Sequence, residues 1–261
     1  MDLGLHDKTA LVLGASRGLG AAVARALANE GATVIAAARS TADIEAWRAT
    51  LPADVAARVV PQQVDMADLA SVEALAAFAL ARGAVDVVVN NGGGPPPGSA
   101  AEAPLAQWSA QFQPMAAHLF HLNGLLLPGM RERKWGRIIT IASSGVEQPI
   151  PNLALSNGIR AAVVGWSKTL AAEVAADGVT VNVVLPGRIH TDRVDQLDQV
   201  AADRQGKSAE QVKAASMAGI PAGRYGRPEE FADMVAFLAS DRAGYVTGSR
   251  VRVDGGMIRS V

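Results

Sequence analysis

Short apolar runs alternate with longer segments of helical periodicity along the whole chain. Apolar runs that predict strands occur at 9–14, 33–38, 58–64, 85–90, 136–142, 179–185 and 249–253. Helical patterns fall at 18–30, 41–51, 67–82, 107–133, 155–177 and 228–240. Strands that are apolar on both faces and separated by helices predict a parallel sheet covered on both sides. The expected fold class is therefore a doubly wound α/β fold.

The segment 193–226 departs from this alternation because it is polar and helix-prone throughout. An insertion late in a doubly wound chain often covers the substrate, so we predict a lid at about 193–226. No internal repeat or low-complexity linker divides the sequence. We therefore expect residues 1–261 to form a single domain with a sizeable hydrophobic core.

Composition narrows the classes of partner. The formal net charge of −1 provides no overall field that attracts nucleic acid or an anionic membrane. The chain has no cysteine and four scattered histidines, which excludes disulfides and thiolate zinc sites and gives no metal-binding pattern. No apolar run reaches the roughly 18–20 residues of a membrane span, and the N-terminus lacks the features of a signal peptide. We expect a soluble cytoplasmic protein that acts on a small molecule without a metal ion.

A glycine-rich turn joins the first predicted strand to the first helix, with the sequence Gly14-Ala15-Ser16-Arg17-Gly18-Leu19-Gly20. A strand, a glycine turn and a helix N-terminus in this order let backbone N–H groups and the helix dipole bind a pyrophosphate. The spacing is G-x-x-x-G-x-G rather than the commoner G-x-G-x-x-G. The turn favours a dinucleotide site, with glycines required only for packing as the alternative.

The end of the second strand distinguishes the two nicotinamide cofactors. An NAD site usually has an acidic residue there for the ribose hydroxyls, whereas an NADP site needs positive charge for the 2′-phosphate. Here the strand ends in three alanines followed by Arg39, and Arg17 lies within the glycine turn. The pattern predicts NADP(H), with two solvated surface arginines as the alternative.

Four further motifs follow the turn in order: Val64-Asp65-Met66, Asn90-Asn91-Gly92-Gly93, Leu185-Pro186-Gly187 and Val253-Asp254-Gly255-Gly256. With the turn, they resemble the short-chain dehydrogenase/reductase family, especially its 3-oxoacyl-carrier-protein-reductase-like branch, over essentially the whole chain. The resemblance implies a Rossmann-type fold with a seven-stranded parallel sheet. It also implies a homo-oligomer, commonly a tetramer formed through the two long helices.

The resemblance assigns cofactor contacts by position. Asp65 is expected at the adenine ring, and Asn90 is expected to shape the cofactor groove. The remaining contacts are expected from the turn and from two later segments: Gly14, Ser16, Arg17, Gly18, Leu19, Gly20, Asn91, Gly92, Pro186, Gly187, Ile189 and Thr191. Asp65 has an alternative interpretation as a helix N-cap, and the two asparagines as turn residues.

The catalytic positions of the family are mostly changed in this chain. Family members use an Asn, a Ser, a Tyr and, four residues after the Tyr, a Lys. Alignment without gaps between 138 and 173 places Ser143 at the Ser position, Ser156 at the Tyr position and Arg160 at the Lys position. Met115 falls where the Asn belongs. Only Ser143 matches the family pattern.

These replacements change the expected chemistry. A serine hydroxyl is a far weaker acid than a phenol with a pKa of about 10, so Ser156 is no direct substitute as a proton donor. Arg160 keeps the positive charge, so it is also expected to bind the cofactor through a ribose hydroxyl, and its guanidinium suits a carboxylate or phosphate. His118 and His190 are alternative proton donors, against a packing role and a surface position respectively. Arg188 either binds an acidic substrate or is solvated.

Two classes of function remain open from the sequence. The first is an NADP(H)-dependent oxidoreductase that reduces a carbonyl or a carbonyl-conjugated double bond with non-standard catalytic residues, Ser143, Ser156 and Arg160. The second is a catalytically impaired NADP(H)-binding protein, acting as a sensor or an oligomer partner. The Gly- and Pro-rich segment 92–98 is either a rigid wall near the cofactor or a simple spacer.

Overall fold

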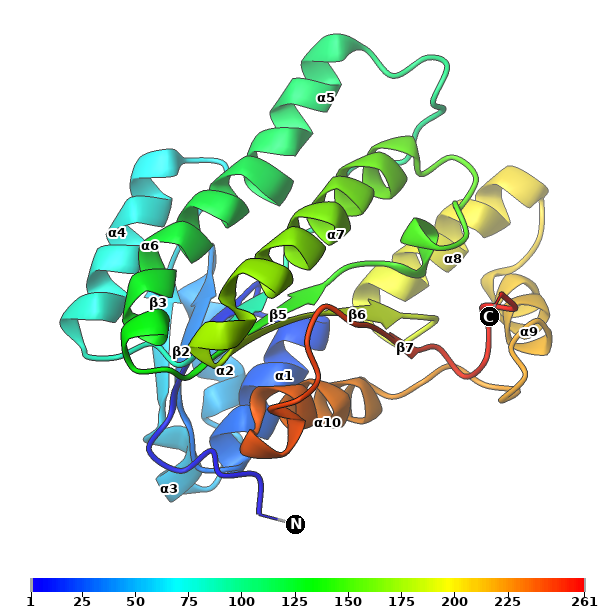
Figure 1. Ribbon diagram of the computed structural model, residues 1–261. Coiled ribbons are helices and arrows are strands. Elements are labelled where there is room, and N and C mark those ends of the chain that lie inside the picture. Colours follow the sequence, from blue (N-terminus) through cyan, green and yellow to red (C-terminus); the bar gives the residue numbers. More distant parts are fainter. Residues whose placement is uncertain (1, 261) are drawn as a thin grey trace.

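The computed structural model describes residues 2–260, and their centre is a seven-stranded, all-parallel sheet (Figure 1). The strand order is β3-β2-β1-β4-β5-β6-β7. The strands are β1 (Thr9–Leu13), β2 (Thr33–Ala38), β3 (Val59–Gln63), β4 (Val87–Asn90), β5 (Gly136–Ile141), β6 (Val179–Pro186) and β7 (Arg250–Val253). The order reverses between β1 and β4, and ligands of open α/β sheets bind at the carboxyl ends of the strands at such a point. The predicted fold class and the seven strands are confirmed.

Helices cover both faces of the sheet (Figure 1). On one face α1 (Gly18–Asn29) packs against α10 (Pro228–Ala239), and α2 (Thr41–Arg48) and α3 (Ala53–Ala56) complete that layer. On the other face lie α4 (Leu69–Ala81), α6 (His118–Glu132) and α7 (Ala154–Val174). Side chains alternate between the two layers along each strand: Val12 of β1 joins the first core and Leu11 the second. This two-sided burial explains why the strands are continuous apolar runs.

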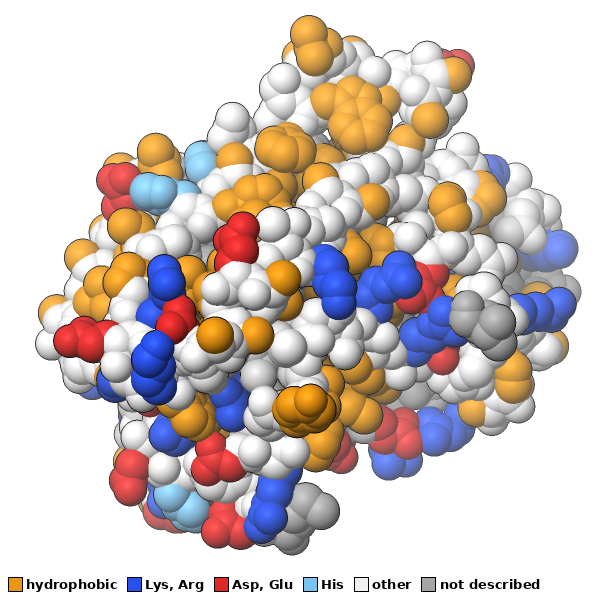
Figure 2. Space-filling view, in the orientation of Figure 1, with side chains coloured by type: hydrophobic (Ala, Val, Ile, Leu, Met, Phe, Trp, Pro, Cys, Tyr) orange, Lys and Arg blue, Asp and Glu red, His pale blue; other side chains and the backbone are white. Residues whose placement is uncertain are grey.

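The predicted helix at 107–133 is wrong in detail, because a π-helical turn interrupts it. The chain forms α5 (Leu105–Phe112), the π turn η1 (Gln113–Ala117) and then α6. Pro114 lies in η1 and has no N–H to donate to the preceding turn, which favours a local widening of the helix. No residue of α5 is buried, and this helix projects from the body with exposed hydrophobic side chains (Figures 1 and 2).

Two other predicted helices are shorter than the patterns suggested. The helix predicted over 41–51 ends at Arg48 as α2, and α3 follows as a separate short helix after Pro52, which stands in extended backbone. The segment 155–177 is α7 followed by a 3-10 turn, η3 (Ala175–Asp177), which ends at Gly178 with a φ of 74°. Strand and helix types are otherwise as predicted.

The segment predicted as a lid forms two helices, α8 (Asp192–Gln205) and α9 (Ala209–Ala218). Both lie at one side of the molecule, beside the ends of β6 and β7 (Figure 1). Arg188 pairs with Asp198 of α8 at 2.9 Å, and Ile189 forms a β-bridge with Gly226 after α9. These contacts attach the segment to the strand that carries the Pro186-Gly187 motif.

None of the helices in residues 2–260 is both long enough and apolar enough to cross a bilayer. Within the same residues no cluster of three or more His, Asp or Glu side chains is placed to hold a metal ion.

Candidate functional site

The glycine turn is tightly closed at the carboxyl end of β1. Gly14 and Gly18 have φ angles of 61° and 57°, which favour glycine. A Cβ at Gly20 would overlap the carbonyl O of Gly14, and a Cβ at Gly14 would lie 2.7 Å from the carbonyl O of Asn91. Gly14 and Gly20 are therefore needed for close packing, so the packing interpretation holds for these two glycines.

The turn nevertheless leaves the N-terminus of α1 free to bind an anion. Arg17 occupies the N-cap position, but its side chain makes no cap hydrogen bond, and the first helical turn has no acidic residue. The first N–H groups of a helix need partners from outside it, and their dipole favours negative charge. The turn is held rigidly from behind, because Trp47 Nε1 donates to the carbonyl O of Ala15 at 2.9 Å. This geometry suits a pyrophosphate.

Asn90 and Asn91, at the end of β4, connect this strand to the elements around it. Asn91 Nδ2 donates to the carbonyl O of Gly14 at 3.4 Å, so its amide braces the turn. Asn90 is buried and exchanges hydrogen bonds with Asn123 of α6, at 3.0 and 3.3 Å, and also donates to Thr140 of β5 at 3.2 Å. Asn123 is a polar residue on the buried face of a helix, between Leu122 and Leu126, and such a residue signals a buried partner. Sequence reasoning missed it.

Two positively charged side chains lie where the sequence predicts the adenosine half of the cofactor. Arg17 and Arg39 are both exposed, and among the hydrogen bonds and ion pairs of residues 2–260 neither side chain has a partner. Asp65, predicted at the adenine ring, is exposed and accepts a 3.0 Å bond from Ala67 N–H. The alternative interpretation of Asp65 as an N-cap is wrong, because Asp68 caps α4 by accepting from Ala70 N–H at 3.0 Å.

The segment after β6 returns to the glycine turn. Gly187 N–H donates to the carbonyl O of Val253 at 3.0 Å, and a Cβ at Gly187 would lie 2.6 Å from Cα of Asp254. The methyl group of Thr191 lies 3.6 Å from where a Cβ of Gly18 would be. The segment that carries the predicted residues Pro186, Gly187, Ile189 and Thr191 therefore runs from the edge strand β7 to the glycine turn.

Ser143 and Ser156 lie where the end of β5 meets the start of α7. Ser143 follows β5, and its Oγ accepts a 3.1 Å bond from Gly145 N–H. Ser156 stands in the first turn of α7, with 8% of its surface exposed. A Cβ at Gly145 would lie 3.3 Å from Ser143 Oγ and would overlap Asn157 Oδ1, so the two serines are carried by segments in direct contact.

Arg160 lies one turn beyond Ser156 on α7 and is largely enclosed. Nη1 donates to the carbonyl O of Ile141 at 3.0 Å and Nη2 to that of Gly92 at 3.5 Å. Burial, and to a lesser extent the positive charge of Arg193, lower the pKa of Arg160 to about 10, so the group stays charged at neutral pH. Behind Arg160 is a small pocket with Met115, Leu119 and Val163 in its lining. Met115, at the position expected for the family's Asn, is 8% exposed and presents an apolar side chain to this pocket.

The sequence is similar to known reductases along almost its whole length. A family model described as enoyl-(acyl carrier protein) reductase matches residues 14–258. A 3-oxoacyl-[acyl-carrier-protein] reductase of Haemophilus influenzae is 37% identical over 257 residues, covering 98% of this chain and all of the relative. Nodulation protein G of Azospirillum brasilense is also 37% identical over 257 residues, covering 97% and 99% of the two chains. The chain belongs to the short-chain dehydrogenase/reductase family.

Two solved structures of NADPH-bound reductases have the same fold as this chain. The L-sorbose reductase of Gluconobacter frateurii, solved with NADPH and L-sorbose, is 32% identical, with a TM-score of 0.93 over 100% of both chains. An actinorhodin polyketide ketoreductase solved with NADPH is 34% identical, with a TM-score of 0.91 over 97% of this chain and 98% of the other.

Two histidines that were considered as proton donors lie elsewhere in this short-chain dehydrogenase/reductase. His118 Nδ1 lies 2.7 Å from the carbonyl O of Met66, so it packs between α6 and the segment before α4. The packing interpretation of His118 is confirmed. The side chain of His190 is 57% exposed and lies 3.5 Å from Asp195, which places it on the surface. Arg188 pairs with Asp198, so its charge is already matched.

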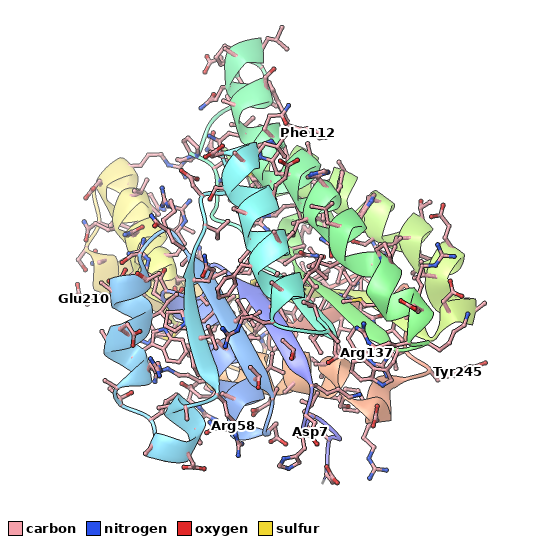
Figure 3. All side chains as sticks on the ribbon, turned by 90° about the vertical axis from the view of Figure 1, so that its left-hand side faces the viewer. Asp7, Arg58, Phe112, Arg137, Glu210 and Tyr245 are labelled. Carbon is pink, nitrogen blue, oxygen red and sulfur yellow. The ribbon has the colours of Figure 1, made fainter. Side chains whose placement is uncertain are left out.

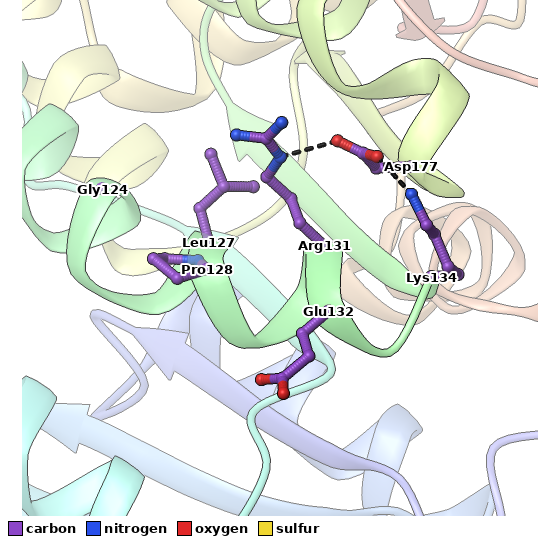
Figure 4. A pocket seen from close by; sticks show the side chains of 7 residues that line it. All are labelled: Gly124, Leu127, Pro128, Arg131, Glu132, Lys134 and Asp177. Atoms are coloured by element: carbon purple, nitrogen blue, oxygen red, sulfur yellow. Dashed lines mark hydrogen bonds and ion pairs between the residues drawn. The ribbon is translucent and has the colours of Figure 1, made fainter.

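A surface hollow of about 640 Å³ lies on the outer side of α6, lined by residues other than those of the predicted site (Figure 4). Arg131 and Lys134 reach into it and both pair with Asp177, at 2.6 and 2.5 Å. Their charges are largely matched there, and none of the predicted site residues contributes to its lining.

Proposed function

We propose that the protein is an NADP(H)-dependent reductase that acts on a carbonyl or a carbonyl-conjugated double bond with non-standard catalytic residues. The observation that carries this proposal is the uncapped N-terminus of α1 facing Thr191, beside two unpaired arginines and no acid at the end of β2. Backbone N–H groups there would hold the pyrophosphate, and Arg17 and Arg39 the 2′-phosphate. The NADPH found in the solved relatives supports the same assignment. Bound NADPH supplies hydride.

The positions of the tyrosines support a catalytic set that lacks the family's Tyr. The sequence has two. Tyr225 is buried and donates to Asp198 at 2.7 Å, and Tyr245 is fully exposed at the edge of the molecule (Figure 3). Lys168 donates to the carbonyl O of Gly248, three turns of α7 away from Ser156. These positions support the proposal that neither a tyrosine phenol nor the Lys168 ammonium takes the role that Tyr or Lys has in the family.

These residues favour reduction of a carbon–carbon double bond conjugated to a carbonyl. Hydride then arrives at a carbon remote from oxygen, and negative charge develops on the substrate oxygen as an enolate. Ser143 Oγ–H and the Arg160 guanidinium would stabilise that oxygen, and water would protonate the neighbouring carbon. Ser156 has too high a pKa to donate a proton and would contribute a hydrogen bond. Ketone reduction with a bound water as the acid is the other form of this proposal.

The alternative is an NADP(H)-binding protein without turnover. The observation that favours it is the apolar pocket behind Arg160, where Met115 excludes a chain of water molecules that would carry protons. Segment 193–226 argues for the reductase, because a lid with its own anchoring contacts is required for a substrate and not for a sensor.

We also propose that the protein forms a homo-oligomer through α6 and α7. Phe120 and Trp166 stack with ring centroids 4.5 Å apart between these helices, and Leu125 of α6 is exposed. Exposed α5 extends the same apolar region (Figure 2). Sedimentation of the purified protein tests this: a single monomeric species at micromolar concentration would reject it.

The test of the proposed function begins with titration of the purified protein with NADPH and NADH, followed by nicotinamide fluorescence. The NADPH complex is then mixed with ketones and conjugated enones. Tight NADPH binding with oxidation by a member of either class establishes the reductase. Tight binding without turnover across the panel supports the binding protein, and absence of binding rejects the cofactor assignment.

A double variant distinguishes ketone reduction from reduction of a conjugated double bond. Ser156→Tyr with Arg160→Lys restores the residues of the family. A gain of ketone reduction in this variant shows that the pocket accepts ketones. If the double variant still binds NADPH but gains no ketone reduction, the result counts against carbonyl reduction and favours reduction of a carbon–carbon double bond.

A further inference from the structure

Two arginines from different helices reach the same loop beside the catalytic positions. Arg160 Nη2, on α7, donates to the carbonyl O of Gly92 at 3.5 Å. Arg193 Nη2, on α8, donates to the carbonyl O of Pro95 at 3.4 Å. A Cβ at Gly94, between these contacts, would lie 3.3 Å from Arg193 Nη2. A stretch of four residues after β4 thus carries a guanidinium at each end.

Within residues 2–260, no carboxylate balances this pair of charges: every ion pair there involves other basic groups. The guanidiniums are near enough for the charge of Arg193 to lower the pKa of Arg160. Two like charges held together disfavour each other until an anion binds between them. Arg160 remains protonated at neutral pH, because its pKa is still about 10.

Arginines with a structural role in this part of the chain are matched. Arg188 pairs with Asp198 at 2.9 Å, and Arg224 pairs with Glu230 at 2.7 Å. Arg193 makes one long bond to a carbonyl and leaves most of its N–H donors free. Arg160 and Arg193 differ from these two arginines because neither has an acidic partner among the described residues.

We propose that Arg160 and Arg193 bind a carboxylate of the substrate, so that the substrate is an oxo acid or an unsaturated oxo acid and not a neutral ketone. This inference rests on the proposed function. Planar guanidinium groups bind carboxylates through paired, charge-assisted hydrogen bonds. Because Arg193 belongs to α8, an anionic substrate would also draw the lid toward the loop at 92–98. Its glycines allow the approach, and its prolines hold the carbonyl groups in place.

The experiment compares acids with their esters on protein saturated with NADP⁺. The probes are 4-oxopentanoate and trans-4-oxo-2-pentenoate, each with its methyl ester, and binding is measured by calorimetry. We expect each acid to bind at least about tenfold more tightly than its ester. Arg193→Gln should remove that preference and change ester binding less than about twofold. Arg204→Gln, in the last turn of the same helix, is the matched control and should behave as the wild type.

Equal binding of acid and ester, including failure of both to bind, overturns the inference. So does an equal loss of NADPH affinity and acid affinity in Arg193→Gln, because the arginines would then serve a cofactor phosphate. Failure of the proposed function is seen separately: the wild type would then bind no NADPH, or would bind NADPH and oxidise it with none of the probes.

Discussion

The phenol of Tyr225 donates a 2.7 Å hydrogen bond to the carboxylate of Asp198, which is 3% exposed. Arg188 binds the other oxygen of the same carboxylate at 2.9 Å. One buried acid therefore joins three segments: the chain after β6, helix α8 and the loop before α10. Burial is the main cause that raises the pKa of Tyr225, so the phenol remains a donor throughout the neutral range.

Replacing Asp198 should loosen segment 193–226, which is the predicted lid. Asp198→Asn leaves the half-buried Arg188 without its counter-charge, and we expect a loss of about 1–3 kcal/mol in the free energy of unfolding. Tyr225→Phe removes one hydrogen bond and should cost about 1 kcal/mol. Urea unfolding measures both losses, and hydrogen exchange locates them. Unchanged exchange over 192–226 in Asp198→Asn would show that this carboxylate does not anchor the lid.

Substitution by alanine should be harmful at Gly20 and stabilising at Gly165. Gly20→Ala places a Cβ against the carbonyl O of Gly14, so the turn must open and NADPH binding should fall at least about tenfold. Gly165→Ala, in the middle of α7, meets no atom within 4 Å and should raise stability by about 0.5–1 kcal/mol. NADPH titration and thermal unfolding of the two variants provide the comparison. Normal NADPH affinity in Gly20→Ala would mean that the turn does not hold the pyrophosphate.

Strands were the most predictable part of this fold. The five inner strands are buried on both faces, so burial sets their limits, and Thr33–Ala38 is as predicted. The edge strands β3 and β7 are partly exposed. The helix at 107–133 was less predictable, because helical periodicity continues through the π turn at Gln113–Ala117 and only Pro114 marks it. Local sequence carries little information about a single extra residue in a helical turn.

The site was predictable where one segment makes the geometry and less so where distant segments meet. The glycine turn needs only its own residues. Arg188 has no partner nearby in sequence; Asp198 reaches it because α8 folds back over the segment after β6. The contact of Arg193 with Pro95 joins residues 98 positions apart, so no spacing pattern indicates it. Non-local pairing of charges therefore decides which arginines are free to bind ligands.

Cofactor preference should depend on Arg39. Arg39→Asp places negative charge where the 2′-phosphate is expected, so NADPH affinity should fall at least about tenfold while NADH affinity is kept or improved. Arg17→Gln should cause a smaller loss because the backbone of the turn is unchanged. Fluorescence titration with both cofactors measures this, with Arg204→Gln as the control. An unchanged preference in Arg39→Asp would remove this residue from the cofactor site.

Acid should weaken the contacts at the start of α10. Hydrogen bonds from Arg224 and from the backbone of Arg227 lower the pKa of Glu230 to about 2. A depressed carboxyl pKa stabilises the folded state above the unfolded value, and this contribution is lost as pH falls through the folded value. The difference in urea midpoint between the wild type and Glu230→Gln should be constant above pH of about 5.5 and should shrink between pH of about 4.5 and 2. A difference that grows toward low pH would contradict the assignment.

The most direct test of a reductase is the fate of the hydride. The protein is incubated with NADPH carrying deuterium at C4 of the nicotinamide, in each of its two stereochemical forms, and with ketones and conjugated enones, both neutral and acidic. Mass spectrometry and NMR then locate deuterium in the products. We predict transfer from one stereochemical form only, to the carbon β to the carbonyl of an enone or to the carbonyl carbon of a ketone. A protein that binds NADPH tightly and transfers no deuterium to any member of the panel would contradict the proposed reductase and favour a cofactor-binding protein.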